Sequence, residues 1–160
     1  MRLFIAINLT AETTAKLLVL TNELRFLSRH GRFSLPENLH LTLVFLGECD
    51  ESQTVDAKTA LAAVSFEPFA LEIERIGRFK RDRGDIWWAG VRENKALLDV
   101  QRKLTDRLLV AGFALDKRGY SPHITLGREV LTETAPRRIE PFGETVRKIE
   151  LMKSERFNGN

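Results

Sequence analysis

Residues 121–129 read SPHITLGRE and residues 38–48 read NLHLTLVFLGE, so one His-x-Thr-Leu pattern occurs twice in this chain. The sequence has only three histidines, and the two patterns contain His40 and His123. Threonine is common on strands, because β-branched residues favour them. A histidine at both matched positions needs a further explanation.

The offset of 83 residues between the two histidines also relates the segments that precede them. It takes Ile5, in the apolar stretch RLFIAIN, to Trp88, in the stretch IWWAGV. A strand, a helix and a histidine-bearing strand therefore recur in the same order, which predicts pseudo-repeats at about 1–80 and 81–160. Neither repeat is long enough to bury its own sheet face well, so we expect a single domain over residues 1–160.

Apolar patterning predicts six strands, over residues 2–8, 39–46, 69–77, 86–91, 121–129 and 145–155. Helical spacing predicts three helices, from Thr10 to about Arg29, over 52–65, and from Lys95, after an Asn94 cap, to about Gly112. Apolar positions assigned to these helices include Ala15, Leu27, Val55, Leu97 and Leu98. Stretches 78–85 and 133–144 are expected to be loops. Several strands are amphipathic, which favours an α+β fold with antiparallel sheets over a doubly wound parallel sheet.

The composition is that of an ordinary globular protein, with 43% hydrophobic and 29% charged residues and a formal net charge of +3. This mild basic excess is compatible with an anionic ligand and does not require one. Cys49 is the only cysteine, which excludes an internal disulfide and fits a reducing compartment. No apolar run approaches the ~18 residues of a membrane span, and the first ten residues lack a signal-peptide cleavage site. We expect a cytoplasmic protein that does not associate with membranes.

Alternate residues of a strand share a face, so His40 lies beside Thr42 and His123 beside Thr125. If a pseudo-twofold axis relates the repeats, the two His-Thr faces can meet across a central cleft. Two imidazoles can supply the acid and the base of an in-line displacement at phosphorus, and two hydroxyls can bind the phosphate oxygens. Arg128 is a further candidate phosphate ligand. It is an odd number of residues from His123, so it needs a bulge near Gly127, or the end of the strand, to reach the same face.

Other interpretations of these residues remain open. Both histidines could be structural remnants of a duplicated fold. A metal site is not expected, because no cluster of His, Asp, Glu or Cys surrounds either histidine. A nucleotide cofactor is not expected either, because the sequence contains no glycine-rich phosphate-binding loop. Trp87 and Trp88 point to opposite faces, so at most one can line the cleft. The basic stretch at 78–83 is either an RNA contact or a solvated loop.

The chain resembles the two-histidine (2H) phosphoesterase superfamily, and within it the RNA 2′,3′-cyclic phosphodiesterase family, also called 2′-5′ RNA ligase. The resemblance rests on PENLHLTLVFLGE and SPHITLGRE, and also on MRLFIAINL, on GRF before IWWAGV, and on LMKSE. It implies a bilobal, duplicated α+β fold with two antiparallel sheets flanked by helices around a central cleft.

The resemblance also implies a reaction, namely hydrolysis of an RNA terminal 2′,3′-cyclic phosphate to a 2′-phosphomonoester without a metal or cofactor. It assigns His40 as the proton donor, His123 as the proton acceptor, and Thr42 and Thr125 as phosphate ligands. The expected partner is RNA with a 2′,3′-cyclic phosphate end, or a cyclic nucleotide, bound by a monomer. The alternatives are a non-catalytic RNA- or nucleotide-binding module on the same fold, 2′-5′ RNA ligation, or cyclic phosphodiester hydrolysis on nucleotides.

Overall fold

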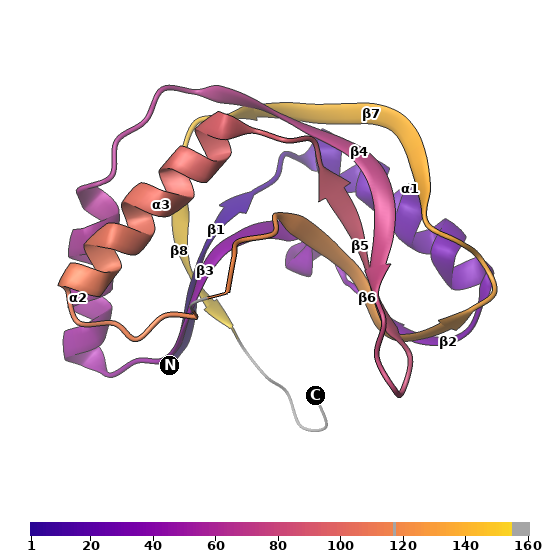
Figure 1. Ribbon diagram of the computed structural model, residues 1–160, viewed down its shortest axis with the longest axis horizontal. Helices are drawn as coiled ribbons and strands as arrows, with labels where there is room; N and C mark the ends of the chain where they lie inside the picture. Colours follow the sequence, from indigo (N-terminus) through magenta and orange to yellow (C-terminus); the bar gives the residue numbers. More distant parts are fainter. Residues whose placement is uncertain (117, 155–160) are drawn as a thin grey trace.

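The computed structural model describes residues 1–116 and 118–154, and Figure 1 shows how their helices and strands are arranged. In chain order the elements are β1 (Arg2–Asn8), α1 (Ala11–Phe26), β2 (Ser28–Phe33), the 3-10 helix η1 (Pro36–Asn38), β3 (His40–Glu48), α2 (Glu51–Ala62), β4 (Phe69–Phe79), β5 (Asp85–Val91), α3 (Lys95–Val110), β6 (His123–Thr132), β7 (Arg137–Val146) and β8 (Glu150–Ser154).

The strands form two sheets, a three-stranded one in the order β3-β1-β8 and a five-stranded one in the order β2-β6-β5-β4-β7. Every paired strand within them is antiparallel. The predicted α+β fold with two antiparallel sheets is therefore confirmed. Each sheet takes strands from both parts of the chain, because β2 and β4 join β5, β6 and β7, and β8 joins β1 and β3.

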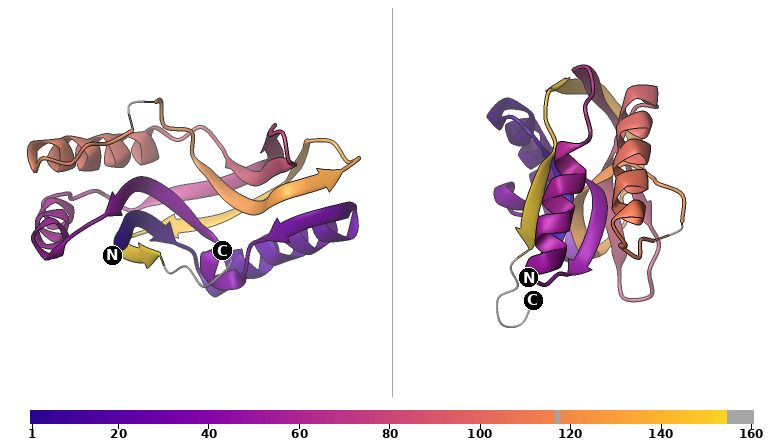
Figure 2. Two further views of the ribbon diagram at one scale, coloured as in Figure 1. Left: turned by 90° about the horizontal axis from the view of Figure 1, so that it is seen from below. Right: turned by 90° about the vertical axis from the view of Figure 1, so that its left-hand side faces the viewer.

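The three α-helices cover the ends of this arrangement. Helix α1 packs against β2, β6 and β7, whereas α2 and α3 pack on each other at the opposite end, as Figures 1 and 2 show. The predicted caps at Thr10 and Asn94 are confirmed, since their side chains accept hydrogen bonds from the backbone N–H groups of Thr13 and Leu97. Gly112, with φ of 97°, follows the end of α3 in the left-handed conformation that suits a helix stop.

One hydrophobic core joins the two sheets. It includes Ile5 and Leu41 from the three-stranded sheet, Ile73 and Trp87 from the five-stranded sheet, and Leu104 from α3. All five side chains are at most 1% exposed. The two sheets and α3 thus contribute to one core.

Two predicted boundaries are wrong because long-range strand pairing overrides local pattern. The first helix ends at Phe26 rather than Arg29, and residues 28–33 form β2, which pairs with β6. Most of the predicted loop 133–144 belongs to β7, which pairs with β4. Pro141 gives β7 a loop-like composition, but an edge strand tolerates proline because one of its sides needs no donor.

Smaller corrections concern the ends and faces of elements. The predicted loop 78–85 is shorter, because β4 runs to Phe79 and β5 starts at Asp85. The predicted strand 145–155 is divided, since β7 ends at Val146 and β8 starts at Glu150, and its last residue, 155, lies outside the described residues. Four of the apolar helix positions named above face solvent, because each packed face is narrower than the apolar pattern suggested; they are Ala15, Leu27, Val55 and Leu98.

The strand pairs that carry the histidines have matching registers. In the first pair Ala6 lies opposite Thr42, and in the second Trp88 lies opposite Thr125. The structural equivalent of Trp88 is thus Ala6, not Ile5, so the offset between the first strands is 82 residues. The loops absorb the difference of one residue, whereas the pairing register cannot. This correspondence supports the interpretation as a duplicated unit.

The adjacent tryptophans provide a test of the packing. Trp87 is 1% exposed in the core, whereas Trp88 is half-buried on the opposite face. We expect Trp87→Ala to lower the free energy of unfolding by about 3–5 kcal/mol, and Trp88→Ala to lower it clearly less. Urea denaturation followed by circular dichroism measures both. Equal losses would show that the two indoles do not divide between core and surface as described.

Candidate active site

The first motif lies on β3, where His40 and Thr42 share a face and Leu41 and Leu43 pack behind them in the core. The His40 ring stacks on Phe4 of β1, with 4.8 Å between ring centroids and 26° between planes. Its Nδ1 is buried and has no hydrogen-bond partner among the described residues. Burial lowers the pKa of His40, because the charged imidazolium loses solvation there.

The second motif lies on β6, where His123 and Thr125 share a face with Trp88 of β5. The ring of Phe79 meets His123 edge-on at 5.1 Å, and the Trp88 centroid lies 6.2 Å from it. Gly77, opposite Trp88, leaves the space that the indole occupies, since an added Cβ would overlap the ring. Trp88 is therefore the tryptophan on the histidine face and Trp87 the one in the core, a choice that the sequence left open.

One contact distinguishes the two histidines. His123 Nδ1 lies 2.7 Å from the backbone carbonyl oxygen of Ser121. A carbonyl can only accept, so Nδ1–H is the donor, and in the neutral ring Nε2 carries the free lone pair. His40 has no comparable acceptor for its Nδ1 among the described residues. In this geometry the Nε2 atom of the neutral His123 ring is able to accept a proton.

The electrostatic surroundings of His123 include Arg128. Burial lowers the pKa of His123, the contact with Ser121 partly opposes this shift, and the positive charge of Arg128 lowers the pKa further. The pairing of β6 with β5 passes over Leu126, because Thr125 pairs with Trp88 whereas Gly127 pairs with Trp87. This irregularity lies where a bulge was needed for Arg128 to reach the histidine face.

The same irregularity occurs in β3, and it determines the position of Phe45. Ile5 pairs with Val44 and Ala6 pairs with Thr42, so Leu43 is passed over. Phe45 then stands five residues after its histidine, as Arg128 does after His123. Its side chain is 71% exposed, with its ring centroid 6.2 Å from that of Phe4.

The basic stretch 78–83 runs from the end of β4 into the turn before β5, and two of its four basic side chains contact other side chains nearby. Arg78 lies 3.7 Å from Asp85 and stacks over the core residue Trp87. The Arg81 guanidinium lies 5.7 Å from the Phe79 ring centroid, which places it next to an aromatic neighbour of His123. Lys80 and Arg83 are exposed. Arg81 is therefore the cation of this stretch that has a structural link to the second motif.

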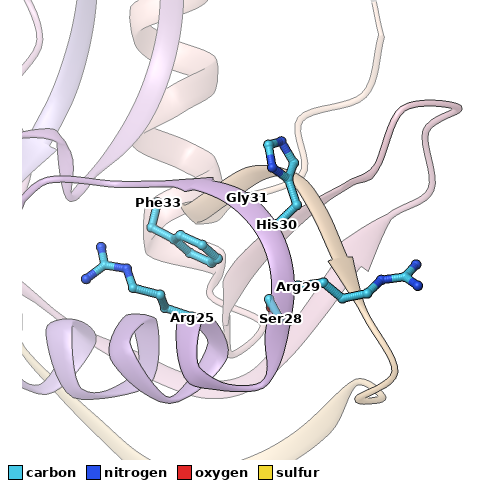
Figure 3. Close-up of a pocket in the computed structure, with 6 residues that line it drawn as sticks. All are labelled: Arg25, Ser28, Arg29, His30, Gly31 and Phe33. Atoms are coloured by element: carbon cyan, nitrogen blue, oxygen red, sulfur yellow. The ribbon is translucent and has the colours of Figure 1, made fainter.

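A pocket of about 340 Å³ lies between the end of α1 and β2 (Figure 3). Its lining includes His30, which is part of β2 and not the helix end that the sequence predicted. Arg25 lies over the Phe33 ring at 5.2 Å on the helix side of this pocket. None of the four motif residues lines the pocket, so it is separate from the candidate site.

The described ranges 1–116 and 118–154 contain no group of three or more His, Cys, Asp or Glu residues placed to hold a metal ion. No helix within the same ranges is long and apolar enough to cross a membrane.

Sequence reasoning missed two residues that connect the motifs. The Tyr120 hydroxyl donates to the backbone carbonyl of Thr42 at 2.9 Å, and the Ser34 hydroxyl donates to that of Thr125 at 2.8 Å. Neither residue belongs to a recognisable pattern. Each lies a few residues before one histidine, and only the tertiary structure shows that it contacts the other motif.

Two imidazoles and two hydroxyls lie on β3 and β6, two strands of different sheets that contact each other. They define a class of site suited to acid–base chemistry on a phosphodiester. The 2′-5′ RNA ligase superfamily model matches residues 15–156 of the chain. An Archaeoglobus fulgidus protein named RNA 2′,3′-cyclic phosphodiesterase is 33% identical over 96% of this chain and 91% of its own length. An Escherichia coli protein of the same name is 33% identical, with 80% of this chain and 72% of its own length covered.

The fold comparison agrees with these matches. The crystal structure of Escherichia coli LigT complexed with 3′-AMP superposes with a TM-score of 0.84 and 25% sequence identity, covering 99% of this chain and 91% of that one. The chain therefore belongs to the 2′-5′ RNA ligase superfamily. The resemblance that the two motifs predicted is confirmed at this level.

The tautomer of His123 can be tested directly. We expect the neutral ring to carry its proton on Nδ1, because the Ser121 carbonyl accepts from that nitrogen. We also expect both His40 and His123 to titrate below about pH 6.5, the ordinary histidine pKa, since burial lowers both values. Long-range ¹H–¹⁵N correlation spectra over a pH series measure both properties. A neutral His123 protonated on Nε2 would contradict the assignment of the base.

Proposed function

We propose that this chain hydrolyses the terminal 2′,3′-cyclic phosphate of RNA to a 2′-phosphomonoester, with His123 as the base and His40 as the acid. The observation that carries the proposal is the contact between His123 Nδ1 and the Ser121 carbonyl, which leaves Nε2 free to accept a proton. The names of the relatives support the substrate class, since several are RNA 2′,3′-cyclic phosphodiesterases.

In the proposed reaction His123 Nε2 removes a proton from water as the water oxygen attacks phosphorus. The bond between phosphorus and the ribose 3′ oxygen breaks, and His40 donates its proton to that oxygen. The hydroxyls of Thr42 and Thr125 donate hydrogen bonds to the non-bridging oxygens, and Arg128 stabilises the charge that develops there. The proton gained by His123 then returns to His40 through solvent, which closes the cycle.

The environments of the two histidines suit these roles. Burial keeps His123 neutral near pH 7 and therefore able to act as a base. His40 becomes a stronger acid for the same reason, because burial without an acceptor for Nδ1 destabilises its imidazolium form. A bound phosphodiester is negatively charged and offsets this effect by raising the pKa of His40 in the complex.

The chain's own residues supply both proton transfers in this scheme, so the proposal includes no metal and no cofactor. A second candidate, 2′-5′ ligation of RNA, would use the same residues in the same roles, with the 5′ hydroxyl of a second RNA end attacking phosphorus in place of water, and the superfamily description favours it. Hydrolysis is the first candidate because water is abundant, whereas ligation needs a second RNA end at the site.

Replacing either histidine tests the acid–base pair. We expect His40→Ala and His123→Ala each to lower kcat about 10²- to 10⁴-fold on an oligonucleotide ending in a 2′,3′-cyclic phosphate. His30→Ala is the matched control, because the third histidine lies in β2 at the separate pocket. Chromatography of the products in excess chelator measures rate and regiochemistry together.

Three results would contradict the proposal: near-wild-type turnover in either motif variant, loss of activity with chelator, or a 3′-phosphate product. Binding of the cyclic phosphate by the wild-type protein without any turnover would support the non-catalytic alternative. Appearance of joined oligonucleotides under the same conditions would favour ligation.

The pH dependence follows from the lowered pKa values. Activity falls below the pKa of His123, where the base is protonated, and falls above the pKa of His40, where the acid has lost its proton. Both values lie below the ordinary one in the free protein, so we expect a bell-shaped kcat/KM profile with its optimum below about pH 6.5. The kcat profile should lie at higher pH, since bound phosphate raises both values. A kcat/KM optimum well above pH 7 would refute this assignment.

A further inference from the structure

The two histidine strands belong to different sheets, and each has a free edge at its motif. Strand β3 is the outer strand of its sheet and pairs only with β1. Strand β6 pairs with β2 only as far as Phe33, which lies opposite Gly127, so the edge beside Thr125 extends past the end of β2. No backbone ladder joins β3 to β6 in the described structure, although the two strands lie side by side (Figure 1).

The free edge of β3 is bound by Tyr120, which lies three residues before His123. Its hydroxyl donates to the Thr42 carbonyl at 2.9 Å, while its ring packs against the core. Burial raises the pKa of Tyr120, so the phenol keeps its proton and remains a donor at every working pH. Because Thr42 is two residues from His40, this bond holds the strand segment that carries the first motif.

The free edge of β6 is bound by Ser34, which lies six residues before His40. Its backbone N–H donates to the Leu126 carbonyl at 2.9 Å, and its hydroxyl donates to the Thr125 carbonyl at 2.8 Å. Ser34 thus continues the line of β2 by one residue and holds the segment that carries the second motif. The two side-chain bonds span 78 and 91 residues of sequence.

The contacts are reciprocal, because the segment before each histidine binds the threonine carbonyl of the other motif. We infer that Tyr120 and Ser34 are positioning residues that set the spacing between His40 and His123. This inference rests on the proposed function, in which a single phosphorus must lie within reach of both imidazoles. A free strand edge has no neighbouring strand to hold it, and a misplacement of about 1 Å can cost up to 10²-fold in rate.

Removing the two hydroxyls tests the inference. Tyr120→Phe keeps the ring, and Ser34→Ala keeps the backbone hydrogen bond to Leu126. We expect each to lower kcat about tenfold, with a much smaller rise in KM. The double variant should lose less than the product of the two single losses, because both bonds maintain the same spacing. Ser34→Thr, which restores a hydroxyl, should recover most of the lost rate.

The matched control is Ser28→Ala, which removes a hydroxyl-to-carbonyl bond of 2.6 Å to Leu24 at the end of α1. This variant should keep its kcat, and thermal unfolding monitors stability in all variants. An unchanged kcat in Tyr120→Phe and Ser34→Ala would overturn the inference. A loss of kcat in Ser28→Ala as large as that in Tyr120→Phe and Ser34→Ala would overturn the inference too. So would losses of kcat that are proportional to the loss of stability across the variants.

A second measurement does not depend on turnover and uses inorganic phosphate as the probe. In the wild-type protein, saturating phosphate should raise the pKa of both His40 and His123, followed in ¹H–¹³C spectra of the rings. In the double variant Tyr120→Phe, Ser34→Ala, phosphate should raise the pKa of only one of the two histidines, because a single anion no longer reaches both rings. Equal responses in the variant and the wild type would overturn the inference. An inactive wild-type protein that shows the double response would instead refute the proposed function and leave the positioning role standing.

Discussion

The antiparallel register of two strand pairs, β1 with β3 and β5 with β6, is the constraint on which the rest of the site depends. A shift by one residue would turn each histidine into the core and expose the leucines behind it. Both pairs pass over one leucine at the same relative place, Leu43 in β3 and Leu126 in β6. Phe45 in one strand and Arg128 in the other thereby take equivalent positions after their motifs. Two strand pairs of matching register thus present different side chains after their motifs.

Desolvation acts on both histidines, yet the local contacts make them unequal. The Ser121 carbonyl fixes a proton on Nδ1 of His123, whereas the same atom of His40 lies buried against Phe4 without an acceptor among the described residues. Buried polar atoms without partners are uncommon in folded proteins. In His40 the unpartnered Nδ1 disfavours the doubly protonated ring, so the imidazolium releases a proton more readily. This property suits the acid of the proposed mechanism. In the proposed mechanism, this backbone carbonyl is the contact that gives the two motifs different roles.

Much of the fold could be predicted from the sequence because its strongest signals are local. The apolar runs that contain Ile5 and Trp87 gave strands, and Thr10 and Asn94 gave helix caps, since those signals depend only on neighbouring residues. The segments that form β2 and β7 could not be predicted in this way. They are polar or contain Pro141, and they become strands only because β6 and β4 offer them an edge to pair with. The single-residue error in aligning Ile5 with Trp88 has a similar origin, since only pairing shows which residues correspond.

The sequence by itself determined that each histidine shares a face with a threonine, because side chains alternate along any strand whatever its neighbours. It also determined that the His-x-Thr-Leu motif occurs twice in matched settings, and these paired motifs carry the resemblance to the superfamily. Only the tertiary structure decided which imidazole nitrogen is free, how Arg128 comes to act on His123, and how Tyr120 and Ser34 hold the opposite motif strands. These features depend on the end of a paired strand, on an interrupted register and on contacts that span 78 and 91 residues. Local pattern carries no information about contacts at that separation, because they form only when the chain has folded.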